Sequence, residues 1–354
     1  MAKLSCYNDP KNCTSRCLEV IEMKIFVEMP VGPETDSFLT QENIDLIESL
    51  GEVVWNKLDR HLTAEELCDA LVDVDILICG WRVQKLTEEV LAKANKLKLV
   101  CYTAGSVFNT VTDAMYDKGI RIVGGNEAFA ESVAEGTMAY MLAGQRRIKY
   151  HNNYMAVNGG REPNFVNHSL LGKTVGVVGY GAISRHLLKM LKPFSVKIKL
   201  FSNHTTEEQA AEMGVQKADL KEIFSTCDII SLHCARSDAN FHLISDELLG
   251  MMKDDALLVN TSRGDVIDEQ ALIRHLQTGR IRAALDVYEV EMPPMDSPIR
   301  QLGPDVLLMP HMGGPTMDRR PAAARLVIDD AKRFIDGEPM ENEILPWRAK
   351  MMTK

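Results

Sequence analysis

The chain has 354 residues, of which 45% are hydrophobic and 25% are charged. At about 150 residues per domain, this length predicts two or three domains with substantial cores, and the composition excludes a disordered chain. Its 40 basic and 50 acidic side chains give a net charge of -10. A nucleic-acid scaffold or a protein that binds anionic membranes would carry the opposite charge, so neither nucleic acid nor membrane is expected as a partner.

The first 22 residues are polar and contain Pro10, so we expect an N-terminal extension (1–22) without the apolar core of a secretory signal. Cys6, Cys13 and Cys17 lack a fourth ligand in register, and no metal site is predicted. Most of the other cysteines lie in apolar segments such as Ile76–Cys79. We therefore expect reduced, buried thiols in a cytoplasmic protein.

From Met23 onward, short β-rich runs alternate with amphipathic helical stretches, which predicts parallel sheets covered by helices. In a first block we expect helices near 42–50 and over 63–71, and a helix that ends at Gly119. The expected strands of this block are 23–27, 75–79, 97–102 and 121–123.

A long helix over about 129–150 precedes a second block, and a final helix over 321–335, stopped by Gly337, returns to the first. The second block has six expected strands, the number found in a dinucleotide-binding doubly wound sheet. These strands are 174–178, 197–201, 229–233, 256–260, 283–287 and 306–309.

A glycine-rich turn opens the second block, where an apolar strand ends in Gly-x-Gly and a helix begins at once. The first glycine would permit the tight turn, and the second would let the backbone approach a pyrophosphate at the helix N-terminus. The third glycine position of the motif holds Ser184. Such a turn alone is weak evidence for a dinucleotide site, but the six expected strands around it strengthen the prediction. The cofactor-binding residues expected here are Gly179, Tyr180, Gly181, Ala182 and Ile183.

The end of the next strand bears on the choice between NAD and NADP. An acidic residue there would bind the adenosine ribose hydroxyls. The chain has Ser202, Asn203 and His204, with no carboxylate and no arginine or lysine. Both cofactors therefore remain open.

Three later segments each follow an apolar strand, so Arg263, Glu291 and His311 could reach one site. Any one of them alone could be structural: a capping or surface arginine, a solvated carboxylate, or a histidine held by packing. The segments are Asn260–Asp265, Leu285–Glu291 and Met309–Gly314.

The order and spacing of four motifs resemble the D-isomer-specific 2-hydroxyacid dehydrogenase family over about residues 23–346. The motifs are Leu170–Thr174, Asn260–Gly264, Leu285–Val287 and Pro310-His311. The resemblance implies an α/β fold of two doubly wound parallel-sheet domains. The resemblance further implies that a Rossmann dinucleotide-binding domain (126–315) is inserted into a flavodoxin-like substrate domain (23–125 and 316–354). It also implies a homodimer formed through the cofactor domains, using the helix after Phe129.

The resemblance places Arg263, Glu291 and His311 at the family's catalytic positions, and their chemistry suits a 2-oxo acid. Arg263 would bind the substrate carboxylate and carbonyl oxygen. His311 would donate a proton to that oxygen as hydride arrives from the nicotinamide, and Glu291 would orient the imidazole and raise its pKa. Asp286 is expected to face the nicotinamide or its ribose, with a structural carboxylate as the alternative.

Further residues are assigned by the same resemblance, with departures from the family pattern. Cys234-Ala235-Arg236 replaces the usual x-Pro-Leu, so Arg236 either helps a 2'-phosphate or is a solvated loop charge. Trp81 either shapes the specificity pocket or packs between domains. The additional cofactor residues are Ser202, Asn203, His204, His233, Cys234, Ala235, Thr261, Ser262, Arg263, Asp286, His311 and Gly314. The substrate residues are Trp81, Gly105, Ser106, Arg263 and His311.

The expected activity is therefore that of an NAD- or NADP-dependent D-2-hydroxyacid dehydrogenase or 2-oxoacid reductase. Its substrate is expected to be a small 2-hydroxy or 2-oxo acid, phosphoglycerate included. The alternative is a dinucleotide-sensing binding protein that resembles the C-terminal-binding-protein corepressors, which share these motifs. Turnover of 2-oxo acids with NADH or NADPH distinguishes the two.

Overall fold

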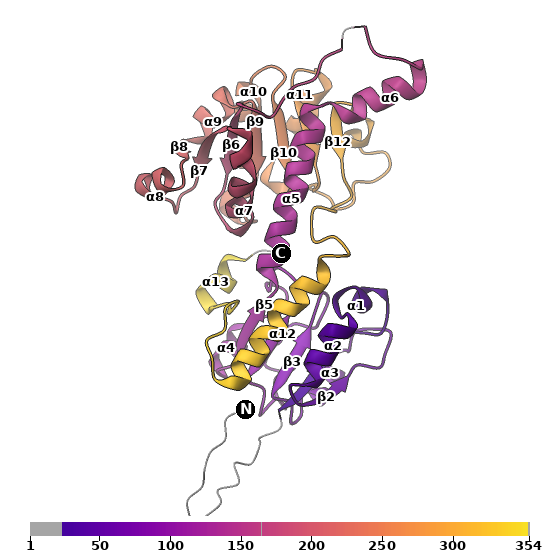
Figure 1. Cartoon of the computed structure of the whole chain (residues 1–354), viewed down its shortest axis with the longest axis vertical. Coiled ribbons are helices and arrows are strands. Elements are labelled where there is room, and N and C mark those ends of the chain that lie inside the picture. The colour runs from indigo at the N-terminus through magenta and orange to yellow at the C-terminus, as the bar shows by residue number, and fades with distance from the viewer. Residues whose placement is uncertain (1–22, 164, 353–354) are drawn as a thin grey trace, which may run out of the picture.

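The computed structural model describes residues 23–163 and 165–352, which form two parallel α/β units joined end to end (Figure 1). The expected N-terminal extension, with Cys6, Cys13 and Cys17, lies outside the described residues. The other five cysteines are unpaired, and all of them except Cys68 are buried. No helix in the described part of the chain has the length and apolar character needed to cross a membrane.

The first unit is a five-stranded parallel sheet in the order β2-β1-β3-β4-β5, the order of flavodoxin. The sequence missed β2 because this edge strand alternates between exposed and half-buried residues and lacks a buried apolar run. The strands are β1 (Lys24–Val27), β2 (Glu52–Trp55), β3 (Ile76–Cys79), β4 (Leu99–Tyr102) and β5 (Arg121–Gly124). The helices are α1 (Pro33–Phe38), α2 (Gln41–Glu48), α3 (Ala64–Ala70) and α4 (Asp113–Asp117).

The chain returns to this sheet through α12 (Arg320–Asp336), as the sequence predicts. The helix buries its apolar face, including Val327 and Ile328, in the same core cluster as β1, β3 and β4. Gly337 ends it with a φ of 74°, a left-handed conformation that favours glycine. A short helix, α13 (Pro346–Met351), follows.

The second unit is a seven-stranded parallel sheet in the order β12-β11-β10-β9-β6-β7-β8. Counted from β6, the order is that of the Rossmann fold with one added strand at the β12 edge. The sequence predicted six of the strands and missed only the two-residue β8. The strands are β6 (Thr174–Val178), β7 (Lys197–Phe201), β8 (Gln216–Lys217), β9 (Ile229–Leu232), β10 (Leu257–Asn260), β11 (Arg282–Leu285) and β12 (Val306–Leu308).

The helices of the second unit cover both faces of its sheet and connect its parallel strands. The α-helices are α7 (Ala182–Leu191), α8 (Glu207–Glu212), α9 (Leu220–Thr226), α10 (Asp246–Met251) and α11 (Glu269–Gln277). The 3-10 helices are η1 (Lys192–Phe194), η2 (Asp238–Asn240), η3 (Gly264–Val266) and η4 (Pro298–Gln301).

The helix expected over 129–150 is instead two helices, α5 (Asn126–Gln145) and α6 (Ile148–Asn158). The break occurs at Arg147, which adopts a left-handed φ of 48°. Its guanidinium makes two 2.7 Å hydrogen bonds to Asp305 and lies over the Tyr150 ring. The continuous helix was therefore wrong, because a contact with a residue 158 positions away turns the chain.

Candidate active site

The carboxyl edges of the two sheets face each other. Helix α5 begins directly after β5, and its first-turn residue Glu127 lies 2.8 Å from the His186 ring and 3.2 Å from Arg185. Both partners are in α7, which itself begins directly after β6. Ligands of doubly wound sheets bind at carboxyl edges, so the facing edges define the candidate site.

One face of α5 contacts the loops that follow several strands. Three residues of α5 share this face: Phe129, Gly136 seven residues later and Tyr140 eleven residues later. These separations are close to two and three turns at 3.6 residues per turn. Phe129 meets Trp81 after β3, Gly136 packs on Gly313 after β12, and Tyr140 binds Asp286 after β11. At 1.5 Å per residue, the contacts at Phe129 and Gly136 are about 10 Å apart along the axis.

The predicted glycine turn lies between β6 and α7. Gly179 has a φ of 101°, and a Cβ there would come within 2.6 Å of the His233 carbonyl oxygen. At Gly181, by contrast, a Cβ would meet no atom within 4 Å, so the backbone at the start of α7 is open to a ligand. Buried Ser184 accepts a 2.7 Å hydrogen bond from the Gly181 amide. The first-turn amides of Ala182 and Ile183 have no carbonyl acceptor within the helix.

The residues that follow β7 are turned into a compact loop. The buried Ser202 hydroxyl accepts hydrogen bonds from the His204 amide, at 3.2 Å, and from the Thr205 hydroxyl, at 2.9 Å. Asn203 and His204 are exposed. Residues 202–204, which directly follow β7, include no carboxylate, arginine or lysine.

The loop after β9 carries the next predicted cofactor residues. The His233 ring bonds to the Ser231 hydroxyl at 2.9 Å through Nε2, and its Nδ1 is buried without a partner. Burial lowers the pKa of His233 to about 4, so the ring is neutral at pH 7. The Cys234 thiol donates to the Val178 carbonyl at 3.4 Å, and Ala235 is exposed beyond it.

The loop after β10 presents Arg263. The buried Asn260 side chain accepts from the Ser262 amide and hydroxyl, at 3.0 and 2.8 Å, and donates to the Arg263 carbonyl at 2.9 Å. Thr261 is fixed to α5 by a 2.9 Å hydroxyl contact with Thr137. Asn260 was visible in the sequence as part of the motif but was not predicted to organise the loop.

Glu291 and His311, predicted to act together, lie side by side. Glu291 Oε1 is 3.5 Å from His311 Nδ1 and accepts a 3.1 Å hydrogen bond from the Tyr288 amide. The loop that presents Arg263 packs against the same segment, because a Cβ on Gly264 would stand 1.8 Å from the Tyr288 carbonyl carbon. Burial lowers the pKa of Arg263, whereas the Asp265 and Glu291 charges raise it.

Asp286 lies behind His311 and is only 2% exposed. Its carboxylate accepts from the Met312 amide at 2.8 Å, the Gly313 amide at 2.8 Å and the Tyr140 hydroxyl at 3.1 Å. These three bonds favour the structural role that the sequence left as the alternative to facing the nicotinamide. Tyr140 went unpredicted because its partner is 146 residues away.

Trp81 packs edge-on against Phe38 and Phe129, with ring centroids 5.1 and 5.9 Å away, and the Arg320 guanidinium lies 5.1 Å from its centroid. This packing supports the structural alternative for Trp81. Gly105 is close to α5, since a Cβ there would lie 3.2 Å from the Phe129 ring. Ser106 accepts a 3.4 Å hydrogen bond from the Phe108 amide.

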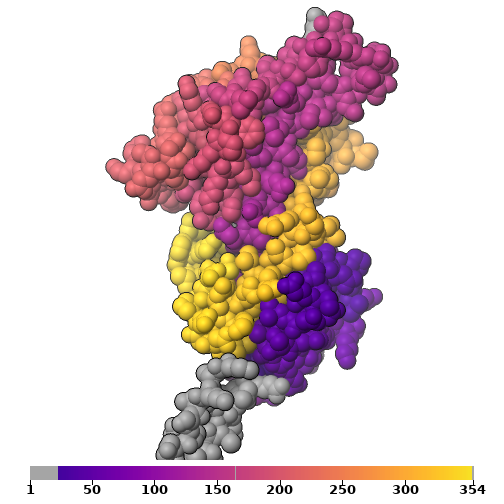
Figure 2. Space-filling view, viewed as in Figure 1, coloured from indigo at the N-terminus to yellow at the C-terminus, as the bar shows by residue number. Residues whose placement is uncertain are grey.

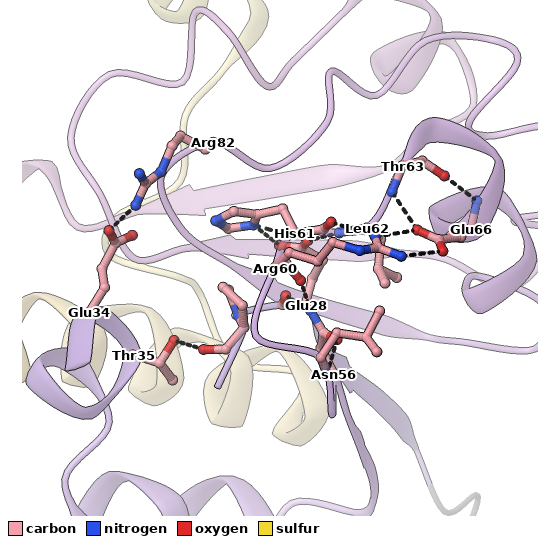
Figure 3. Close-up of polar contacts among 12 residues, drawn as sticks. Glu28, Glu34, Thr35, Asn56, Arg60, His61, Leu62, Thr63, Glu66 and Arg82 are labelled. Carbon is pink, nitrogen blue, oxygen red and sulfur yellow. Dashed lines mark hydrogen bonds and ion pairs between the residues drawn. The ribbon is translucent and has the colours of Figure 1, made fainter. Parts of the chain in front are cut away.

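A buried carboxylate at the carboxyl end of β1 was not predicted (Figure 3). Glu28 has no exposed surface, lies 3.0 Å from His61 Nδ1 and accepts from the Leu62 amide at 3.1 Å. Burial raises the pKa of Glu28, and the His61 contact opposes the shift. The group ties the end of β1 to the loop after β2, and an acidic residue directly after an apolar run was its signal in the sequence.

The site residues fit a dinucleotide. The open backbone at Gly181 and the unpaired amides of the first turn of α7 suit a pyrophosphate. A Cβ on Gly314 would also meet nothing within 4 Å. Among the described residues, no group of three or more histidine, cysteine, aspartate and glutamate side chains is placed to hold a metal.

Comparisons with known proteins identify the family of the chain. The profile of the D-isomer specific 2-hydroxyacid dehydrogenase, NAD binding domain, matches residues 138–313. A glyoxylate reductase of Thermococcus litoralis is 30% identical over 308 residues, 85% of this chain and 92% of that protein. The chain belongs to the D-isomer specific 2-hydroxyacid dehydrogenase family. It therefore carries this family's NAD-binding domain.

Two further relatives show the range of the family. A D-3-phosphoglycerate dehydrogenase of Methanocaldococcus jannaschii is 36% identical over 308 residues, 86% of this chain, but the chain spans only 58% of that relative's length. The solved structure of an acyclic imino acid reductase (Bsp5) with NADPH and D-Arg has a TM-score of 0.73 and 26% identity. The match covers 91% of this chain and 100% of that one.

Proposed function

We propose that the protein is an NAD(P)-dependent D-2-hydroxyacid dehydrogenase that reduces small 2-oxo acids and oxidises the corresponding 2-hydroxy acids. The observation that carries the proposal is the His311–Glu291 pair, 3.5 Å apart, against the loop that presents Arg263. A proton donor, its orienting carboxylate and a fixed cation are the groups that reduction of a 2-oxo acid needs.

Each of the three side chains has a separate role in the proposed reaction. Arg263, always charged and planar, binds the substrate carboxylate and polarises the carbonyl oxygen. His311 gives its proton to that oxygen, and Glu291 holds the imidazole through Nδ1, which leaves Nε2 to face the substrate. The nicotinamide, when bound, supplies or accepts the hydride at the substrate C2 atom. Gly179 to Ile183 would hold the pyrophosphate.

The end of β7 bears on cofactor choice. Ser202, Asn203 and His204 offer neither a carboxylate that repels a 2'-phosphate nor a cation that attracts one. We therefore propose that both NADH and NADPH bind, with dissociation constants within about tenfold of each other, or 1.4 kcal/mol.

A second copy of the chain is the proposed partner. Helix α6 stands off the body of the second unit (Figure 2), and it buries none of its residues. It exposes the apolar side chains of Ile148, Met155 and Val157. A homodimer through the second unit would cover them. The unpaired thiols support a reducing, cytoplasmic location for the protein.

Replacing His311 by glutamine tests the proposed function. Wild-type protein is mixed with NADH or NADPH and a panel containing glyoxylate, hydroxypyruvate, pyruvate and 3-phosphohydroxypyruvate. We expect turnover with at least one acid, and a fall of 100-fold to 10,000-fold in kcat for H311Q, roughly the range for a lost general acid. Dinucleotide affinity should change little. Tight dinucleotide binding without turnover of any acid would instead favour the binding-protein alternative.

A further inference from the structure

A second arginine, Arg236, adjoins the loop that presents Arg263. Its Nε lies 2.7 Å from Asp265 Oδ2. The Asp265 side chain is 12% exposed, whereas that of Arg236 is 52% exposed. Asp265 is the middle residue of η3, which begins immediately after Arg263. Asp265 therefore lies next to the segment that carries Arg263 and pairs with Arg236.

Asp265 acts electrostatically on Arg263 as well. Burial is the largest influence on the pKa of Arg263 and lowers it; Asp265 raises this pKa, and Arg236 lowers it. The geometry agrees with these directions, because Asp265 is two residues from Arg263 in the chain and 2.7 Å from Arg236. A carboxylate that pairs with one guanidinium has less hydrogen-bonding capacity left for another.

The segment that carries Arg236 is anchored to η3. The Asn240 side chain donates to the Ala235 carbonyl at 2.7 Å, and the His242 amide donates to the Asp265 carbonyl at 2.9 Å. These bonds hold the Arg236 segment against Asp265. Arg236 stands where the family pattern has the leucine of x-Pro-Leu, so the pair belongs to this chain's departure from the pattern.

We propose, on the basis of the proposed function, that Arg236 is a positioning residue. It engages the Asp265 carboxylate and so keeps that carboxylate from competing with the substrate carboxylate for Arg263. Asp265 and the substrate are competing anions for one guanidinium. Asp265 is only two residues from Arg263, so its effective concentration far exceeds that of a substrate in solution. When Arg236 pairs with Asp265, this carboxylate no longer competes with the substrate for Arg263. The 2.7 Å pair also favours this role over binding of a 2'-phosphate.

The test compares R236Q, the double variant R236Q/D265N and a matched control, R274Q. Arg274 makes a comparable 3.0 Å ion pair with Asp246, 60% exposed on both sides, on α11 of the same unit. Steady-state kinetics use saturating NADH and the 2-oxo acid that the wild type reduces best. If Asp265 occupies Arg263 nine-tenths of the time in R236Q, KM rises about tenfold while kcat stays within about twofold. The double variant should recover a KM within about threefold of wild type, and R274Q should match wild type.

Three other outcomes would overturn the proposal. The first is a KM for R236Q equal to the wild-type value. The second is the same raised KM in R236Q and R236Q/D265N together with a lowered Tm, which would mean that Arg236 only stabilises its loop. The third is weaker binding of NADPH alone in R236Q, which would mean that Arg236 binds a 2'-phosphate.

Affinity for oxamate, a carboxylate analogue of a 2-oxo acid, is measured by calorimetry on the same variants in the presence of NADH. The same order is expected: weaker binding in R236Q and recovery in the double variant. This readout needs no turnover. An inactive wild type would therefore refute the proposed function, while the oxamate affinities would still decide the role of Arg236.

Discussion

Replacing Asp286 by asparagine tests whether one buried carboxylate holds His311 in place. The carboxylate accepts three hydrogen bonds through its two oxygens, and an asparagine keeps one accepting oxygen but puts an NH2 group, which only donates, in place of the other. If the NH2 group of the new asparagine points toward the Gly313 amide, two donors stand 2.8 Å apart. If the side chain is flipped, its NH2 group faces the Met312 amide and the Tyr140 hydroxyl instead. At least one bond to a charged acceptor is lost, so the free energy of unfolding should fall by about 2–4 kcal/mol. For a unit of about 190 residues this lowers Tm by roughly 5–15 °C, measured by calorimetry.

The same substitution should reduce catalysis through the backbone of His311. That residue has a left-handed φ of 52°, a conformation that costs a non-glycine residue about 1–3 kcal/mol and must be held by its surroundings. Asp286 binds the next two amides, so D286N should let His311 relax and lower kcat about 100-fold. NADH affinity should change less than threefold.

Y140F is the matched control for D286N. It removes one neutral donor from the same carboxylate and leaves the Met312 and Gly313 amides bound. It should cost about 1 kcal/mol and leave kcat within about twofold of wild type. The reasoning fails if D286N keeps its kcat and its Tm, or if Y140F reproduces the full loss of kcat.

Two further predictions concern His233 and α6. The folded-state pKa of His233 is about 4, below the ordinary value of 6.5. Between these two pH values the unfolded chain therefore binds more protons than the folded chain. The stability that the neutral ring contributes is complete above pH 6.5 and is lost as the pH falls toward 4. Urea unfolding of wild type and H233Q from pH 7.5 to 4 should show up to about 3 kcal/mol of additional loss in the wild type, and parallel pH dependences would contradict this. If α6 lies in a homodimer interface, light scattering should give twice the chain mass for the wild type and the single-chain mass for V157E; a dimeric V157E would place the interface elsewhere.

The strands were predictable from the sequence because buried parallel strands are continuous apolar runs, as in Val175 to Val178. Strand β2 was missed because it lies at the edge and is only half covered. Motif spacing predicted Arg263, Glu291 and His311 as site residues, and the structure places Glu291 3.5 Å from His311. Pairings across the chain were not predictable. The break at Arg147 depends on Asp305, and the role of Asp286 depends on Tyr140, and no local pattern encodes a partner more than 100 residues away.

In the described part of the chain, the polypeptide passes between the two units twice, through α5 and through the segment from Met309 to Arg319. The two passages touch where a Cβ on Gly136 would lie 3.4 Å from Gly313, and the Arg319–Glu131 ion pair joins them again at 2.5 Å. A rotation of one unit against the other must turn about this contact, and atoms near a pivot move least. Such a rotation would carry Trp81 and the rest of the first unit's edge past His311, whose ring, two residues from Gly313, would stay nearly still.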